Sequence, residues 1–145
     1  MRRILTSAFL LTTLPVLAHP LSSSPVGSWC QSTDKGQSCF QYMTFQADGT
    51  LLTQGQYTKM GMGFEGDATW TQKGDQTCIS ETRIDTYRLD TGAWLGEAYI
   101  PARCDTVLAI DATHYNYRKP NGDTERLIRV SDSLALHQEF TAGRN

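Results

Sequence analysis

The sequence predicts an all-β protein, an antiparallel barrel or sandwich of about eight strands. Helical periodicity is scarce between residues 26 and 130. In its place, short segments rich in Thr, Tyr, Val, Ile and Trp alternate with turn signals. Because the connections between these segments are short, neighbouring strands are expected to run antiparallel.

Residues 1–18 have the pattern of a secretory signal peptide. An arginine pair precedes an apolar stretch at 4–17, which is too short for a membrane span. Val16 and Ala18 are small residues at the −3 and −1 positions of a cleavage site. The pattern predicts a secreted or periplasmic protein with no membrane attachment after cleavage.

The expected mature chain is one domain behind a short linker. Residues 19–25 form the tether and residues 26–145 form the β-domain. Removing Arg2 and Arg3 from the 13 Lys and Arg leaves 11 against 15 Asp and Glu, a net charge of −4. The charges are interspersed without basic clusters, so neither nucleic acid nor an anionic membrane is expected as a partner.

The first three strands are expected at 26–31, 38–46 and 51–60. An Asp-Lys-Gly turn joins the first two strands. Ala-Asp-Gly-Thr at 47–50 joins the next two, since Asp-Gly readily takes the positive φ angles of a tight hairpin. The glycine-rich stretch at 61–66 is expected to be a loop. It spells Gly-x-Gly-x-x-Gly but leads into a strand, which excludes a dinucleotide site.

The second half of the chain continues the pattern of strands and turns. A Lys-Gly-Asp turn separates strands at 67–72 and 77–89, and the stretch at 91–104 reads as irregular and then extended. The remaining elements are strands at 106–111, 113–119 and 125–130, and a short helix at 131–140 with Ser131 or Asp132 as its N-cap.

Four cysteines in an exported chain suggest two disulfides. Of the three possible pairings, Cys30–Cys39 with Cys78–Cys104 is preferred, because the first pair brackets the turn-like Gln-Ser-Thr-Asp-Lys-Gly-Gln-Ser. The sequence has no Cys-x-x-Cys pair, so no zinc site is expected. His19 would begin the mature chain, but nothing near it fixes the geometry that copper needs. No metal or cofactor is expected.

Side-chain alternation assigns Trp29 a structural role. If Trp29 faces the core, Cys30 faces away, and the bridge puts Cys39 outside as well. Gly27 would let a neighbouring segment approach closely, while Trp29 plugs one end of the barrel. The residues expected to point inward on the second strand are Phe40, Tyr42 and Thr44.

Short motifs in the first half of the chain resemble the small bacterial lipocalin-like proteins of the calycin type. The matching positions are Gly27 and Trp29, then Phe45, Asp48, Gly49 and Thr50, then Trp70, Gly74 and Asp75. The resemblance implies an up-and-down barrel of about eight strands whose base is closed by the first tryptophan. It also implies an arginine from a late strand over that ring, with Arg126 and Arg129 as candidates. The family implies a cup that binds a small apolar ligand, or a barrel with no known ligand, and it does not imply catalysis.

An aromatic set is the predicted ligand pocket. Its members are Tyr42, Tyr57, Trp70, Tyr115 and Tyr117. Small-molecule sites in barrels are lined by apolar and aromatic side chains with a few polar groups. The alternative is that these rings fill the core of a barrel too small to hold a cavity.

Two functions therefore compete, and neither is enzymatic. One is a carrier of a small apolar or aromatic ligand. The other is a protein-binding module, such as an inhibitor or immunity protein of an exported hydrolase, with Trp94 as its interface anchor. The sequence has no Gly-x-Ser-x-Gly elbow. Asp67, Glu81 and Asp85 are interpreted as a solvated face rather than an acid–base pair.

Overall fold

The computed structural model describes residues 24–32 and 39–130. The signal peptide, most of the 19–25 tether, the turn at 34–36 and the helix expected at 131–140 lie outside these ranges. The described chain is almost entirely β-structure. Its elements are β1 (Gly27–Gln31), β2 (Gln41–Phe45), β3 (Thr50–Tyr57), the 3-10 turn η1 (Thr58–Met60), β4 (Met62–Lys73), β5 (Gln76–Ile79), β6 (Thr82–Arg88), β7 (Trp94–Ile100), β8 (Arg103–Ile110), β9 (His114–Arg118) and β10 (Thr124–Arg129).

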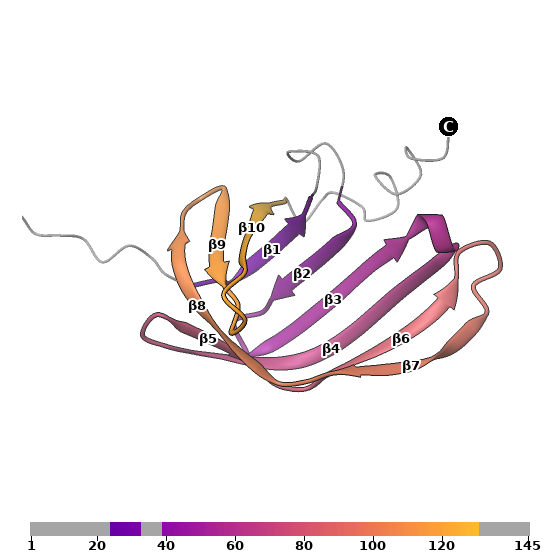
Figure 1. Cartoon of the computed structure of the whole chain (residues 1–145), viewed down its shortest axis with the longest axis horizontal. Helices are drawn as coiled ribbons and strands as arrows, with labels where there is room; N and C mark the ends of the chain where they lie inside the picture. Colours follow the sequence, from indigo (N-terminus) through magenta and orange to yellow (C-terminus); the bar gives the residue numbers. More distant parts are fainter. Residues whose placement is uncertain (1–23, 33–38, 131–145) are drawn as a thin grey trace, which may run out of the picture.

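Eight of the ten strands close an antiparallel barrel. The order of hydrogen-bonded neighbours is β3-β2-β1-β10-β9-β8-β5-β4, and a β3–β4 pairing closes the circle. Each barrel strand therefore pairs with the barrel strands before and after it in the chain, which is the up-and-down arrangement. Figure 1 shows β1, β2, β8, β9 and β10 gathered at one end of the molecule. The predicted fold class is confirmed.

The other two strands form a β-hairpin, β6–β7, which runs beside β4 and continues its sheet (Figure 1); we call this hairpin the arm. Strand β4 provides the branch point. Its residues 62–67 pair with β6, whereas its residues 70–73 pair with β5. Strand β7 pairs with β6 and ends the strand order. The stretch 77–89, expected as one strand, is divided between β5 and β6.

The glycine-rich stretch 61–66, expected as a loop, is mostly part of β4. Gly63 in this stretch and Gly55 on β3 make room for rings from neighbouring strands. A Cβ at Gly63 would collide with the Tyr87 ring, and a Cβ at Gly55 on β3 would collide with the Phe64 ring. Aromatic side chains that cover glycines in this way stabilise the pairing of β3, β4 and β6, so these glycines serve packing rather than chain mobility.

The barrel interior is packed with apolar and aromatic side chains. Trp29 and Leu127 are fully buried. The ring centroids of Trp29 and Tyr115 lie 5.6 Å apart, and those of Phe45 and Trp70 lie 5.5 Å apart, both edge to face. The core cluster consists of Trp29, Met43, Phe45, Leu51, Ala68, Ile79, Ile110, Tyr115, Tyr117 and Leu127, with Trp70 and Val107 packed against it.

The facing predicted for the second strand is wrong. Trp29 pairs with Met43, while Cys30 pairs with Tyr42, so Met43 points into the barrel and Tyr42 away from it. Tyr42 is buried against the two bridged cysteines in a separate cluster. The reason is local: β2 begins only at Gln41, after a bend at residue 40, so the alternation expected from Cys39 does not reach Tyr42. The inward side chains are Gln41, Met43 and Phe45 instead of Phe40, Tyr42 and Thr44.

Both predicted disulfides are confirmed. Cys30–Cys39 bridges residues nine apart, and Cys78–Cys104 bridges residues 26 apart. Cys78 and Cys104 lie directly opposite each other on β5 and β8. The second bridge therefore holds together two neighbouring strands of the barrel, at the side where the arm departs.

Candidate functional site

Trp29 is fully buried in the core of the barrel. Its indole Nε1 donates a hydrogen bond to the carbonyl of Pro25 at 2.6 Å. The guanidinium carbon of Arg129 lies 4.1 Å from the ring centroid, and Arg129 Nη1 donates to the carbonyl of Val26 at 3.3 Å. Of the two arginines considered for this contact, Arg129 makes it. Gly27 permits the arrangement, because a Cβ there would collide with Arg129 Nη1.

A buried carboxylate and two buried tyrosines lie in the barrel interior. The Asp105 carboxylate is buried and accepts from Arg103 Nε at 3.0 Å. Tyr115 and Tyr117 are nearly fully buried. Burial raises the pKa of Tyr115 to about 12 and raises that of Tyr117 as well. Tyrosines in such surroundings stay neutral at physiological pH and act as packing groups with a polar tip.

The five aromatic residues predicted to form a ligand pocket do not surround a common space. Trp70, Tyr115 and Tyr117 belong to the barrel core. Tyr42 lies on the other side of the sheet, and Tyr57 is 51% exposed at the end of β3, in contact with Phe64. The rings of Tyr115 and Tyr117 lie 5.2 Å apart and pack against each other. Three of the five rings therefore fill the interior.

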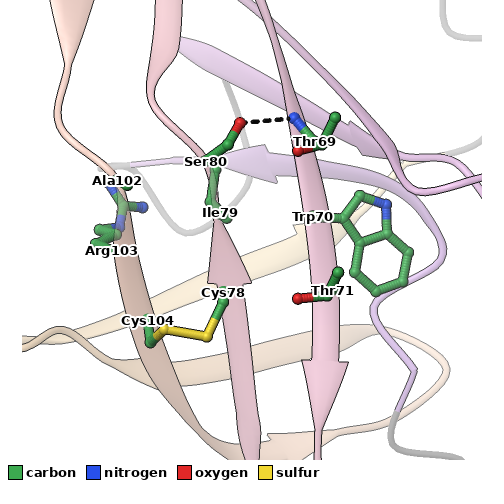
Figure 2. A pocket seen from close by; sticks show the side chains of 9 residues that line it. All are labelled: Thr69, Trp70, Thr71, Cys78, Ile79, Ser80, Ala102, Arg103 and Cys104. Atoms are coloured by element: carbon green, nitrogen blue, oxygen red, sulfur yellow. Dashed lines mark hydrogen bonds between the residues drawn. A yellow bond between two sulfur atoms is a disulfide. The ribbon is translucent and has the colours of Figure 1, made fainter.

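An open pocket of about 500 Å³ lies where β4, β5 and β8 meet (Figure 2). The Cys78–Cys104 bridge and Ser80 line it. The Ser80 hydroxyl accepts from the backbone N–H of Thr69 at 2.9 Å and donates to the carbonyl of Glu81 at 3.2 Å. Backbone groups hold this hydroxyl on both sides, so it ties β4 to the β5–β6 junction and is not placed as a nucleophile.

The arm presents a charged surface, which we call the arm face. Cross-strand pairing places its members on one side of β4, β6 and β7: Glu65, Asp67, Arg83, Asp85, Glu97 and Tyr99, with Trp94 hydrogen-bonded to the same group. Arg83 Nη2 lies 2.8 Å from Asp85 Oδ2, and this contact lowers the pKa of the Asp85 carboxyl. The Trp94 indole donates to the other oxygen of Asp85 at 3.4 Å. The expectation that Asp67 and Asp85 belong to a solvated face agrees with this geometry.

Strand β7 carries the most exposed apolar side chains of the arm. The exposed fractions are 67% for Trp94, 47% for Leu95, 53% for Tyr99 and 40% for Ile100. Of these four residues, Trp94 alone is predicted from the sequence as an interface residue. The segment Trp-Leu-Gly-Glu-Ala-Tyr-Ile holds a single charge and ends before Pro101, a pattern that indicates an exposed apolar edge strand.

Within residues 24–32 and 39–130, no three His, Cys, Asp or Glu side chains come together as ligands for a metal ion. The same ranges contain no helix long and apolar enough to cross a membrane. The surface of the arm combines exposed rings with carboxylates.

The fold and this surface define the protein as a closed eight-stranded antiparallel barrel with a β-hairpin arm and two disulfides. Comparison of the chain with family models, curated proteins and solved structures finds no match.

Proposed function

We propose that this chain is an exported, non-catalytic, lipocalin-like protein that binds another protein through its arm. The packing of the barrel interior supports this proposal, because a carrier would need an open cup where Tyr115 and Tyr117 pack against each other and Trp70 packs against Phe45. An inhibitor or immunity protein of an exported hydrolase is the class of module that fits. Such a protein acts by occupying a surface and needs no chemistry of its own.

The exposure of Trp94 carries the proposal. This indole is 67% exposed, yet its N–H is held by Asp85. Large rings at protein interfaces supply much of the binding energy, and a ring with few rotamers loses little entropy on binding. The barrel closes without β7, so closure of the barrel does not explain an aromatic residue at this position.

Export is part of the same proposal. Two disulfides suit a protein that folds in an oxidising compartment, and residues 1–18 have the composition of a signal peptide. N-terminal sequencing of the periplasmic or secreted form should begin at His19 or within a few residues of it. Recovery of the intact chain from the cytoplasm would contradict export.

A small apolar ligand remains a second candidate because of one pocket outside the barrel core. An open pocket of about 500 Å³ is lined by Phe40, Gln56, Tyr57, Thr58, Lys59 and Met60. It contains Tyr57 from the predicted ligand set, and two further apolar side chains face it. Mass spectrometry of small molecules extracted from the purified mature protein tests this candidate.

The decisive experiment is in situ crosslinking of the mature protein in the envelope of its source cells. Three versions are compared: wild type, Trp94→Ala, and Leu108→Ala as a control. Leu108 is 45% exposed on barrel strand β8, so both variants remove an exposed apolar side chain. A specific partner should be recovered with wild type and Leu108→Ala and lost with Trp94→Ala. Equal recovery with Trp94→Ala would show that the arm is not the binding surface.

A further inference from the structure

Strand β7 is an unprotected sheet edge. It ends the strand order, and within the described residues it pairs with β6 alone. Exposed edges are usually blunted by lysines, internal prolines or short length. β7 has seven residues, no lysine, no internal proline and one charged side chain, Glu97. Such an edge is suited to accept another strand.

The two faces beside this edge differ in chemistry. Trp94, Glu97 and Tyr99 lie on the arm face. On the opposite face, Ile100 lies two residues after Ala98, which pairs with the buried Ile84. Leu95 lines a pocket with Met62, and the Arg88–Asp90 ion pair lines the same pocket. One side of an added strand would therefore meet carboxylates and rings, and the other would meet aliphatic side chains beside an ion pair that is already neutralised.

The charge on the arm face favours a basic occupant. It holds four carboxylates, Glu65, Asp67, Asp85 and Glu97, against the single guanidinium of Arg83. Arg83 is already paired with Asp85 at 2.8 Å. A second copy of this chain, added edge to edge, would bring like charges together, whereas Lys or Arg would meet opposite charge and the exposed ring of Trp94.

We propose, on the basis of the protein-binding function above, that the partner adds an extended basic segment to β7 as a further strand. Its alternate residues are Lys or Arg over the arm face and aliphatic residues beside Leu95 and Ile100. Backbone hydrogen bonds along β7 provide the attachment, and the alternation of side chains provides the specificity.

Three synthetic ten-residue peptides test this proposal by calorimetry with the full mature protein. (Lys-Val)5 has the proposed charge and can form a strand. (Lys-Pro)5 has the same charge but lacks half of the backbone donors and cannot form a regular strand. (Glu-Val)5 can form a strand with the opposite charge. We expect (Lys-Val)5 to bind at least tenfold more tightly than either of the others. If (Lys-Pro)5 binds as tightly as (Lys-Val)5, charge alone explains the binding and no strand is added. If (Glu-Val)5 binds as tightly as (Lys-Val)5, the site does not prefer a basic segment. Either result overturns the proposal.

Two charge reversals locate the site. Glu97→Lys changes the centre of β7, whereas Asp75→Lys makes the same change in net charge at the exposed β4–β5 turn of the barrel. We expect (Lys-Val)5 affinity to fall at least tenfold with Glu97→Lys and less than twofold with Asp75→Lys. Equal losses would mean that the peptide responds to total charge. Circular dichroism melts establish that both variants are folded.

Amide hydrogen exchange reports the mode of binding directly. With (Lys-Val)5 bound, the outward-facing amides of β7 should exchange at least tenfold more slowly, while barrel amides remain unchanged. Binding without protection of β7 would refute strand addition. If crosslinking recovers a Trp94-dependent partner but the peptides fail, the strand proposal falls and the protein-binding function stands; if no Trp94-dependent partner is recovered, the function itself fails.

Discussion

Arg129 lies over the indole ring of Trp29, with its guanidinium carbon 4.1 Å from the ring centroid. The two residues are direct cross-strand partners on β10 and β1. Because β10 is the last strand and β1 the first, this contact connects the first and last strands of the barrel. A cation held over an aromatic face contributes about 0.5–1 kcal/mol at partly exposed sites, in addition to the burial of the ring.

The loss of the Trp29 ring should therefore threaten the whole fold. Trp29 is fully buried, and truncation to alanine leaves a large cavity, for which the typical loss in unfolding free energy is about 3–5 kcal/mol. Trp94→Ala should change the unfolding free energy by about 0.5 kcal/mol or less, because its ring is 67% exposed. Denaturant unfolding of both variants measures the difference. Equal, small losses would show that Trp29 does not support the core.

Gly27→Ala tests why glycine stands two residues before this tryptophan. Gly27 has a φ of 129°, and a Cβ would collide with Arg129 Nη1. Gly122 has a φ of 93°, and a Cβ at that position would meet no other atom within 4 Å. Gly122→Ala therefore isolates the backbone strain, about 1–3 kcal/mol. We expect Gly27→Ala to lower the unfolding free energy by about 1 kcal/mol more than this control, since it also displaces the guanidinium.

A double-mutant cycle decides whether Arg129 is the cause. In an Arg129→Ala background the collision disappears, so the loss of unfolding free energy caused by Gly27→Ala should fall to the loss caused by Gly122→Ala. If Gly27→Ala costs as much in that background as in wild type, the collision with Arg129 does not cause the extra loss. Chemical denaturation of wild type, Gly27→Ala, Arg129→Ala and the double variant provides the comparison.

Local signals predicted the barrel well. Gly27 and Trp29, the Asp48-Gly49 turn and the cysteine spacing all act through neighbours in sequence or through one strand pairing. At the Asp48-Gly49 turn, Gly49 has a φ of 89° and Asp48 Oδ1 accepts from the Thr50 N–H at 2.9 Å. Such features follow from residue type and spacing alone, so the sequence predicts them.

The arm could not be predicted in the same way. Residues 62–73 form one unbroken strand, and nothing in its alternation shows that its first half pairs with β6 and its second half with β5. That division depends on pairings between distant segments. The sequence also cannot distinguish rings that fill a barrel from rings that line a cup, because both point inward. This is why Tyr115 and Tyr117, which are core residues, were predicted to line a pocket. The predicted direction of Tyr42 is wrong because the chain bends before β2.

The two disulfides should differ in their access to reductant. Cys30 and Cys39 are 1% and 5% exposed, whereas Cys78–Cys104 borders an open pocket (Figure 2). Since thiolate attack requires access to sulfur, mild reduction followed by alkylation should label Cys78 and Cys104 first. Peptide mass mapping over time measures the order. Earlier labelling of Cys30 and Cys39 would contradict the burial of the first bridge.

Alkaline pH should destabilise the barrel through its interior tyrosines. The pKa of Tyr115 is raised to about 12 by burial, and that of Tyr117 is raised too. Between about pH 10, where an unfolded tyrosine loses its proton, and the raised folded values, the folded state binds more protons than the unfolded state. The unfolding free energy is therefore unaffected by these groups below about pH 10 and falls as pH rises above it.

The expected slope is about 1.4 kcal/mol per pH unit for each tyrosine that stays protonated in the folded state. Tyr115→Phe should reduce the slope, since phenylalanine packs similarly and has no proton to lose. Tyr99→Phe is the control: its hydroxyl donates to Glu97, but the ring is 53% exposed on the arm, where solvent screens the interaction. Denaturant unfolding at several values between pH 8 and 12 measures the slopes. If Tyr115→Phe keeps the wild-type slope above pH 10, the buried phenol is not the group that couples folding to alkaline pH.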